Sequence, residues 1–529
     1  MSILHHISRK NRQRNSGGKY PAALDNAVTL AIFLMKLGHK KNSQPGIMFA
    51  GLFLWLTREM SSIESAQDIP DFYRVSTAAP CTKNAFRINK ANGVSWCEYT
   101  LCHHKNIQAK EQHYVWQPVP TAFNALMLAF IKKKRYFNAL QSSTNTSSYF
   151  LSRPEKAALF DILSEIKWKT PAALSAYPRV RKDRFFNYFF HCVQADNHLG
   201  AIVRMTLLPS NRHHHQSAYS YQRLDSDQIR YKIFEAHNRY LTALICAMRD
   251  AELVDKIKSP TIKETISLFT TIPKFPNHLS QFGRILQHQL VSAKKSGNVE
   301  ITAPIHIGSR RYVDETDVTA FFKRLFTHIK KNAPIQSATK DQWIAHYNLA
   351  TYRIAFLFIV LTGVRPNHSI SIPAHRNFGN HTVFVSDKGR LRMLSLNPYL
   401  QQEIARYLQY QQFVLSLTPE KFPHDDLWFC LTPEGVPYSL SNRLLRHFMH
   451  DLWPGIVPYQ LRHFFAQSAT NSDLSIQLGD QDVDRLMGHS NLGEHLGSDD
   501  VFAPTHARMQ QHLHSLSGRL GLQEMDYGQ

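Results

Sequence analysis

Apolar residues fall into runs of helical length along most of this chain. Val28–Leu37 and Ile47–Leu56 are apolar almost throughout, and both are shorter than the roughly 20 residues that a membrane-spanning helix needs. We therefore expect two buried helices and no membrane segment. Residues 120–310 have mostly helical patterns, with Ile229–Met248 as one long helix. Residues 94–99 have the β-branched and aromatic composition of a strand.

The last third of the chain alternates between helical and strand patterns. Val313–Lys331 predicts an amphipathic helix, and Trp343–Leu361 predicts a helix buried nearly all round because its second half is entirely apolar. Asn380–Leu396 alternates and turns at Asp387–Gly389, which predicts a β-hairpin with Lys388 at its tip. The remaining expected elements are one short strand, Leu427–Cys430, and the helices Pro398–Leu415, Ser439–Leu452, Leu461–Ala469, Gln481–Met487 and Met509–Leu522.

The whole pattern predicts a mainly α fold with a small β-sheet, in the α+β class. At 529 residues, the chain is too long for a single core. We expect an N-terminal extension over residues 1–150, in which a basic arm precedes a helical or mixed domain. A helical domain is expected over residues 151–310, and a mixed domain over residues 311–529.

The charge of the chain indicates a polyanionic partner. It carries 62 lysines and arginines against 40 aspartates and glutamates, which gives a formal net charge of +22. A protein with such an excess of positive charge most often binds nucleic acid. The alternative is that the excess charge only keeps the chain in solution and serves no specific partner. Residues 1–20 are rich in these cations and contain no acid, so they form either a basic arm on DNA or a plain tail.

Four short segments of the last third each present cations or hydrogen-bond donors beside apolar residues. Arginine matches two phosphate oxygens with its planar fork, while lysine and histidine donate protons. Two arginines, a lysine and a histidine at one point therefore suit a phosphate group, and ordinary surface or helix-capping residues are the alternative. The segments are Leu361–Pro366 with Arg365, Ser386–Arg390 with Lys388, Tyr459–His463 with Tyr459 and Arg462, and Leu486–Ser490 with His489.

The order of these segments resembles the tyrosine recombinase (phage-integrase-type) family, from near Val313 onward. That family has a T-G-x-R turn, a lysine on a hairpin, an H-x-x-R-H motif and an L-G-H-S motif. Arg365, Lys388, Arg462 and His489 match its phosphate-binding positions, with Tyr459 in place of the first histidine of the third motif. The resemblance implies a catalytic-fold domain over 311–529 and a helical core-binding domain over 151–310, which together clamp double-stranded DNA.

The nucleophilic tyrosine of the family is missing from its expected place. Phe502 stands there, and it has no hydroxyl with which to attack phosphorus. The only tyrosine after His489 is Tyr527. Phe502 therefore predicts a domain that holds DNA without cutting it. The alternative is an active recombinase or integrase that uses Tyr527 as its nucleophile. A third possibility is a topoisomerase of a related type, which would also need a tyrosine nucleophile.

A recombinase fold without its nucleophile resembles the inactivated (TnsF-type) target selectors of Tn-seven-type transposons. That resemblance implies a sequence-specific double-stranded DNA-binding protein that selects a target or attachment site for transposition. The implied partners are a transposon AAA+ ATPase and a transposase, with a dimer on DNA and no strand cleavage by this chain.

Basic residues elsewhere are further candidates for DNA contact. One group precedes a run of aromatic residues, and one arginine begins a histidine-rich loop. Two more lie on the predicted helix Ser439–Leu452, and a histidine follows Arg462 directly. Cations next to aromatic residues suit nucleic acid, although the aromatic residues themselves are expected in the core. For the helix, a solvated face is the alternative. These candidates are Arg179, Arg181, Lys182, Arg212, Arg443, Arg446 and His463.

Neither a metal motif nor a cofactor motif is evident. Cys97 and Cys102 form one near pair and Cys81 lies apart, so ordinary cysteines are expected in preference to a zinc site. The chain has no G-x-x-x-x-G-K-[ST] phosphate-binding motif. Six cysteines in so long a chain form no disulfide framework, and a cytoplasmic protein is expected.

Overall fold

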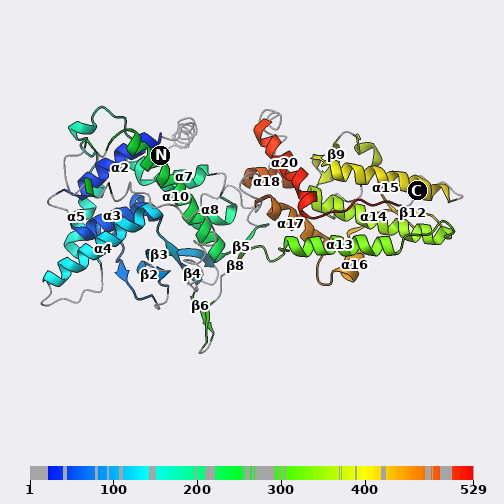
Figure 1. The fold of residues 1–529 in the computed structure, drawn as a ribbon, viewed down its shortest axis with the longest axis horizontal. Helices are drawn as coiled ribbons and strands as arrows, with labels where there is room; N and C mark the ends of the chain where they lie inside the picture. Colours follow the sequence, from blue (N-terminus) through cyan, green and yellow to red (C-terminus); the bar gives the residue numbers. More distant parts are fainter. Residues whose placement is uncertain are drawn as a thin grey trace, which may run out of the picture. The chain divides into compact units, whose positions relative to one another are not determined.

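The chain folds into two compact units (Figure 1). The N-terminal unit comprises residues 1–199, 203–210 and 224–307, and the C-terminal unit comprises residues 200–202, 211–223 and 308–529. The computed structural model describes residues 22–39, 44–77, 81–91, 94–106, 111–141, 150–196, 199–208, 221–253, 255–256, 263–264, 267, 292–296, 299–302, 306–367, 370, 372–379, 381–387, 390–418, 424–470, 478, 480–488 and 503–527.

Up to residue 308, helices accompany a four-stranded sheet of order β1-β2-β3-β4. β1 pairs parallel with β2, and the other pairs are antiparallel. The elements are α2 (Ala23–Leu37), α3 (Pro45–Thr57), β1 (Tyr73–Arg74), β2 (Ala85–Ala91), β3 (Val94–Asn106), β4 (Glu111–Pro118), α4 (Thr121–Gln141), α5 (Arg153–Ser164), α6 (Lys182–Phe186), α7 (Tyr188–Ala195), α8 (Ala201–Leu207), β5 (Arg223–Asp225), α10 (Ser226–Asp250), β6 (Ser292–Ser296), β7 (Val299–Thr302) and β8 (His306–Gly308), with short 3-10 turns at Met60–Ser62, Ala66–Asp68 and Ala172–Leu174.

The two apolar runs near the N-terminus form buried helices, as predicted. α3 is buried along almost its whole length, and Trp55 in this helix packs against the rings of Phe185 and Phe189. The indole nitrogen of Trp55 donates to the carbonyl of Phe185 at 2.8 Å, so this buried donor is satisfied. Buried side chains from α2 to α10 form one cluster, and the predicted boundary at residue 150 falls inside it.

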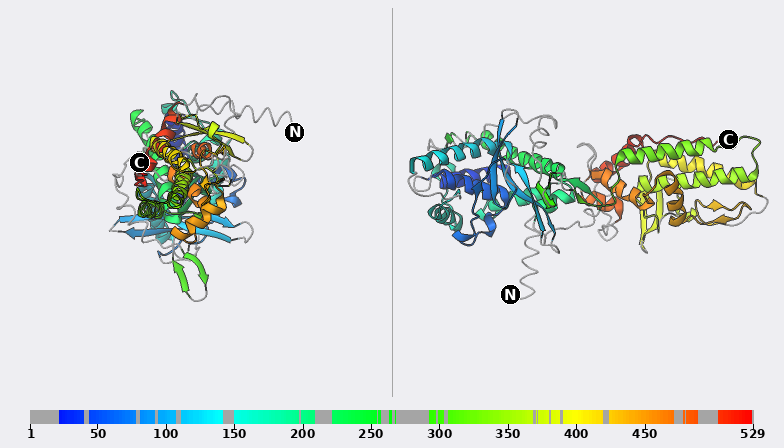
Figure 2. Two further views of the ribbon diagram at one scale, coloured as in Figure 1. Left: turned by 90° about the vertical axis from the view of Figure 1, so that its right-hand side faces the viewer. Right: turned by 90° about the horizontal axis from the view of Figure 1, so that it is seen from below.

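The C-terminal unit contains long helices and two small antiparallel sheets in the residues that the structure describes. α13, α14 and α15 lie side by side (Figures 1 and 2). Its elements are α13 (Glu315–Lys331), α14 (Lys340–Thr362), a 3-10 turn (Ala374–Arg376), β9 (Thr382–Asp387), β10 (Arg390–Ser395), α15 (Pro398–Ser416), β11 (Cys430–Leu431), β12 (Pro437–Tyr438), α16 (Asn442–Leu452), α17 (Pro458–Thr470), α18 (Asp480–Met487) and α20 (Ala503–Arg519).

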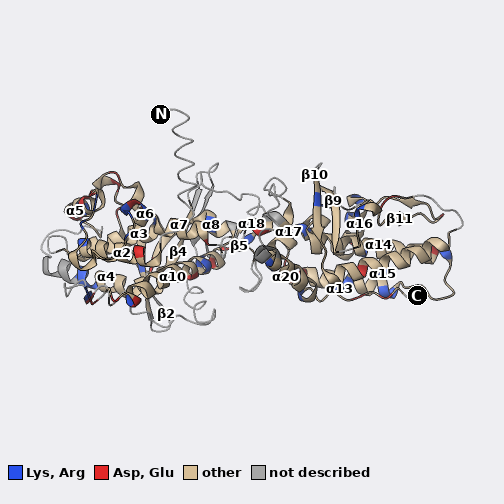
Figure 3. Cartoon of the chain, turned by 90° about the horizontal axis from the view of Figure 1, so that it is seen from above, with Lys and Arg blue, Asp and Glu red and all other residues tan. Residues whose placement is uncertain are grey.

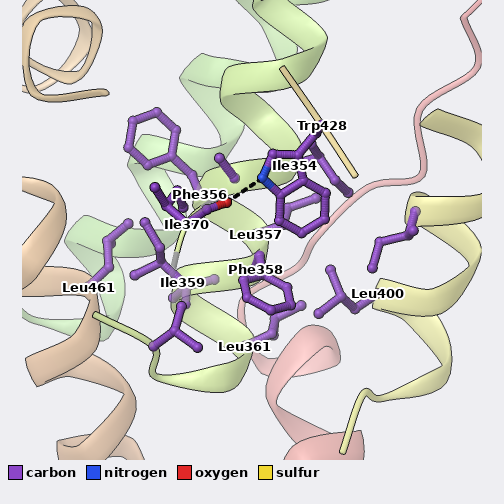
Figure 4. Close-up of a cluster of buried hydrophobic side chains, with 14 of the residues drawn as sticks. Ile354, Phe356, Leu357, Phe358, Ile359, Leu361, Ile370, Leu400, Trp428 and Leu461 are labelled. Carbon is purple, nitrogen blue, oxygen red and sulfur yellow. Dashed lines mark hydrogen bonds between the residues drawn. The ribbon is translucent and has the colours of Figure 1, made fainter. Parts of the chain in front are cut away.

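Helix α14 is the central element of this unit. Thr339 caps its N-terminus by accepting a hydrogen bond from the backbone of Gln342, and its second half is buried on every side. Figure 4 shows its side chains packed against α15 and Trp428, whose indole nitrogen donates to the carbonyl of Ile370 at 2.6 Å. Among the described residues, α14 alone is long and apolar enough to cross a membrane, and 78% of its most apolar window is buried within the protein.

The architecture is therefore mixed α+β and mostly helical, as the pattern of the sequence predicts. Several boundaries differ from the expected ones; the last helix, α20, spans Ala503–Arg519 where Met509–Leu522 was expected. The strand expected over Leu427–Cys430 is limited to β11 (Cys430–Leu431), since the backbone nitrogen of Leu427 bonds to Ile372 instead. α17 begins at Pro458, so Tyr459 and Arg462 lie on one helix.

A buried ion-pair network holds the C-terminal segment against α14 and α15. Arg353 pairs with Glu403, and both side chains are almost fully buried. Arg353 also donates to the carbonyl of Gln523 at 2.7 Å, and Glu403 accepts from the backbone of Met525 at 3.2 Å. Tyr527 stacks on Tyr410, with ring centroids 4.8 Å apart. The last described residues are therefore part of the core.

His512 on α20 makes folding depend on pH. Burial, together with the charge of Arg519, lowers the pKa of His512 to about 4, and neither ring nitrogen has a hydrogen-bond partner. Below its ordinary pKa of 6.5, the unfolded chain takes up a proton that the folded chain binds only near pH 4. Stability is therefore fully present above pH 6.5 and decreases as the pH falls towards 4.

We expect His512→Leu to raise the free energy of unfolding by about 2 kcal/mol near pH 5 and to flatten its dependence on pH. Native-state hydrogen exchange of the α14 and α20 amides measures this in the full chain. His514→Leu is the matched control, because His514 is exposed on the same helix. An equal response of both variants to pH would contradict the role of His512.

Candidate phosphate-binding site

The first predicted segment makes a close turn at the end of α14. Gly363 has a left-handed φ of 65°, which favours glycine. A Cβ atom there would overlap the Phe465 ring on α17 and lie 3.1 Å from the sulfur of Met487 on α18. The backbone before Arg365 therefore packs directly against the elements that carry the third and fourth segments.

Arg462 ties three of the four segments together. Its side chain is fully buried, and its guanidinium donates to the carbonyl of Gly363 and, at 2.9 Å, to that of Met487. The face of the guanidinium also lies over the ring of Tyr221, 5.6 Å from its centroid. Charged donors satisfy both helix-end carbonyls, so Arg462 positions the backbone around the site.

The hairpin that carries the second segment joins the same cluster. Arg392 on β10 donates to the carbonyl of Leu486 at the end of α18. Gly488 follows with a φ of 68°, and a Cβ atom there would lie 2.8 Å from the Cδ of Arg392. The turn before Arg365, the helix of Arg462, the end of α18 and strand β10 therefore lie together, while Lys388 and His489 themselves lie outside the described residues.

Tyr459 lies half-buried at the front of this cluster. Its phenol oxygen accepts hydrogen bonds from Tyr221 and from Arg365, whose side chain is 9% exposed. The guanidinium of Arg311, which is exposed, lies 5.4 Å from the centre of the Tyr459 ring. A phenol that accepts two bonds still has its hydrogen to donate, so the front of the cluster presents donors and positive charge.

The electrostatics favour negative charge at Tyr459. Burial alone would raise the pKa of Tyr459, but the hydrogen bond from Tyr221 and the charges of Arg462 and Arg365 outweigh it and lower that pKa. The pKa of Tyr221 is raised, mainly because the residue is buried. A group whose anionic form is stabilised marks a point where the protein concentrates positive potential.

His463 supports the cluster from within. It is buried, its ring contacts those of Tyr221 and Tyr459, and its Nδ1 lies 3.2 Å from the hydroxyl of Ser309. Burial and the neighbouring charges of Arg311 and Arg462 lower the pKa of His463 to about 4, so it is neutral near pH 7. A direct contact with DNA is therefore not available to its ring in this structure.

Several predicted site residues are not part of this cluster. Tyr527 is buried and hydrogen-bonds to Arg353, at 3.5 Å, in the network of α14 and α15. Its hydroxyl is therefore not presented to the front of the site. The predicted residues Lys388, His489, Phe502 and Arg212 lie outside the described residues.

The other basic candidates lie in two different settings. Arg443 and Arg446 are exposed on α16, whose Leu445 and Met449 are buried (Figure 3 colours lysines and arginines blue). Lys182 and Arg179, by contrast, donate to backbone carbonyls of their own unit at 2.6 and 2.7 Å. Arg181 is largely exposed and pairs with Asp183. In this structure, the side chains of Lys182 and Arg179 therefore stabilise the fold of their own unit.

The cysteines form no ligand set in the part of the chain that the structure describes. Within those residues, no group of three or more histidine, cysteine, aspartate or glutamate side chains is arranged to hold a metal ion. Burial raises the pKa of the Cys81 thiol to about 12, and it also raises that of Cys97.

Sequence reasoning missed two members of the cluster. Tyr221 comes from a segment more than two hundred residues before Arg462, and only the fold brings them together. Arg311 belongs to the pair Arg310–Arg311 directly before α13, so its charge was a signal in the sequence. Its contact with Tyr459 could not have been read from that signal.

Comparisons of the chain with protein-family models, with curated proteins and with solved structures found no match. The chemistry of the cluster therefore has to be derived from its own residues.

Proposed function

We propose that the C-terminal unit binds double-stranded DNA and holds a backbone phosphate at the front of the cluster. The observation that carries this proposal is the environment of the half-buried Tyr459, which has the charge of the buried Arg365 on one side and the exposed guanidinium of Arg311 at its ring. Phosphate oxygens are acceptors only, so a site made of donors and cations suits them. The net charge of +22 supports the same partner, because DNA binding releases counterions.

We further propose that this unit is a recombinase-like domain that binds DNA without cleaving it. The order of the four segments motivates the resemblance, and the contacts of Arg462 with Gly363 and Met487 and of Arg392 with Leu486 support it. Phe502 offers no nucleophile, and Tyr527 is held in the core by Arg353. The N-terminal unit, which includes most of the described residues between 151 and 310, would supply the second half of a DNA clamp.

A DNA-binding protein of this kind needs partners to act. We propose that the chain selects a target or attachment site and recruits a transposon AAA+ ATPase and a transposase. It would do so in the cytoplasm, bound to DNA. The resemblance to inactivated recombinase target selectors motivates these partners, and pull-down of the two enzymes in the presence of the bound site tests them.

We expect Arg365→Ala to weaken binding of the full chain to DNA by about tenfold and to reduce the slope of log affinity against log salt by about 1. The reason is the loss of one phosphate contact. Fluorescence anisotropy over a salt series measures both quantities, with a duplex that the wild-type chain selects from a random-sequence pool. Tyr459→Phe, which keeps the ring, should also weaken binding.

Lys340→Ala is the matched control. It removes one positive charge from the same unit, but Lys340 donates to the carbonyl of Glu434 and lies apart from the cluster. An equal loss in the Lys340 and Arg365 variants would indicate unspecific charge attraction and contradict the site. Absence of DNA binding by the wild-type chain would contradict the function itself.

A further inference from the structure

A group of exposed cations lies on the N-terminal unit, where helix α4, strand β1 and the start of helix α5 meet. Lys132 and Arg135 are three residues apart on α4, so they share one face of that helix. Arg74 lies on β1, and Arg153 is the first residue of α5. All four side chains are exposed, and we call them the α4 basic surface.

Contacts between the three elements hold this surface together. Lys134, the residue before Arg135, forms an ion pair with Glu155 on α5, with 2.5 Å between Nζ and Oε1. The backbone nitrogen of Phe150, just before α5, donates to the carbonyl of Phe72, just before β1, at 2.6 Å. The start of α5 therefore contacts both α4 and the segment that leads into β1.

The unit leaves the positive charges of this surface without acidic partners. Two acids beside these elements, Asp71 and Glu155, are each paired with a lysine at 2.5 Å. In the described residues, no ion pair involves any of the four cations of the surface. Partial burial and the neighbouring positive charge of Arg135 lower the pKa of Arg74. Like charges held near one another without a counter-charge concentrate positive potential and attract an anion.

The position of these cations within α4 excludes a role at the end of the helix. α4 spans Thr121–Gln141, so residues 132–135 lie more than one turn before its end, where the helix dipole no longer attracts cations. Within this run, Lys133 and Lys134 pair with acids of the same unit, whereas Lys132 and Arg135 do not. The run therefore divides into a pair bound within the unit and a pair available to a partner.

The chemistry of the α4 basic surface favours duplex DNA as that partner. Three of its four cations are arginines, whose planar guanidinium matches two phosphate oxygens at once. The centre of a protein–protein interface is apolar or aromatic, but no large apolar side chain is exposed among the described residues between 69 and 160. A polar, positively charged surface of this kind is typical of an interface with DNA.

We propose that the α4 basic surface binds the phosphate backbone of the duplex, on a segment that flanks the one held by the C-terminal unit. This inference rests on the proposed function, since it requires DNA at the Tyr459 cluster. It places a DNA contact mainly in residues 1–150, whereas the resemblance implies DNA contact only from residue 151 onward. Phosphate contacts carry no sequence information, so the surface adds affinity and lengthens the bound segment without changing the sequence that is selected.

The test compares wild type with Lys132→Ala/Arg135→Ala in the full chain. Both side chains are exposed and alanine favours a helix, so the fold should be retained. The probe is a long duplex with the sequence that wild type selects from a random-sequence pool at its centre. Hydroxyl-radical footprinting shows which parts of its backbone are protected, and fluorescence anisotropy over a salt series gives the affinity.

Wild type should protect a central tract and a flanking tract of the backbone. The double variant should lose the flanking tract and keep the central one. Its affinity should fall about tenfold, and its slope of log affinity against log salt should fall by about 2, because two phosphate contacts are lost. Arg365→Ala should instead weaken protection of the central tract.

Lys133→Ala/Lys263→Ala is the matched control, because it removes two lysines of the same unit that are paired with acids. It should keep both tracts. An equal loss in the control would overturn the inference, since that indicates unspecific charge attraction. Unchanged DNA binding by Lys132→Ala/Arg135→Ala would also overturn it and would indicate an acidic protein as the partner. Failure of wild type to bind the duplex would instead overturn the proposed function.

Discussion

Glu403→Ala lowers the free energy of unfolding of the C-terminal unit by about 3–5 kcal/mol. The carboxylate is fully buried, pairs with Arg353 and Arg406, and accepts from the backbone of Met525. Its removal leaves the buried Arg353 guanidinium without its counter-charge, which is more costly than the loss of one hydrogen bond. Native-state hydrogen exchange of the α14 amides in the full chain measures the effect.

Two further variants separate this explanation from simple loss of charge. Glu434→Ala removes an exposed carboxylate from the same unit and should change the free energy of unfolding by less than about 0.5 kcal/mol. The double variant Arg353→Met/Glu403→Leu should recover most of the loss, because apolar residues of similar volume often replace a buried pair without penalty. A double variant as unstable as Glu403→Ala would show that packing of the carboxylate, and not the uncompensated charge, is what matters.

Gly363→Ala destabilises the same unit by about 3 kcal/mol. The left-handed backbone at this position disfavours a side chain, and the added Cβ would overlap the Phe465 ring. The overlap would force α14 and α17 apart at the turn that leads to Arg365. We therefore expect a loss of DNA affinity in the same variant, measured by anisotropy alongside hydrogen exchange.

Gly379→Ala isolates the backbone part of this effect. Gly379 has nearly the same φ, 67°, but its Cβ would have no neighbour within 4 Å. It should therefore cost about 1 kcal/mol, the strain of the left-handed conformation alone. Equal effects at the two glycines would contradict the close contact between the turn and α17.

The sequence predicts the elements of the C-terminal unit well because their patterns are strong. The unbroken apolar run of α14 and the alternation of β9 and β10 leave few other structures open. It also predicts that the four segments meet, and of these the Gly363 turn, Arg462 and the end of α18 lie together in the described residues. The positions of Lys388 and His489 stay a prediction.

The rest depends on tertiary contacts that no local pattern records. β2 and β4 were not expected, because they carry polar residues that are buried through tertiary pairing: Arg87 on β2 pairs with Glu98 on β3, and Gln117 on β4 donates to the carbonyl of Arg230. Arg462 was expected to face a phosphate, yet it is fully buried and bonds to two carbonyls. A buried cation satisfied by backbone oxygens has no acidic partner in the sequence to reveal it.

The most direct test of DNA binding without cleavage uses a nicked suicide duplex built on the selected site. The same binding reactions are run on native and on denaturing gels, for wild type and for Tyr527→Phe. We predict a retarded complex on the native gel and no covalent protein–DNA band on the denaturing gel, for both chains. A covalent band that disappears in Tyr527→Phe would contradict this account and identify an active recombinase, and absence of the retarded complex would contradict DNA binding.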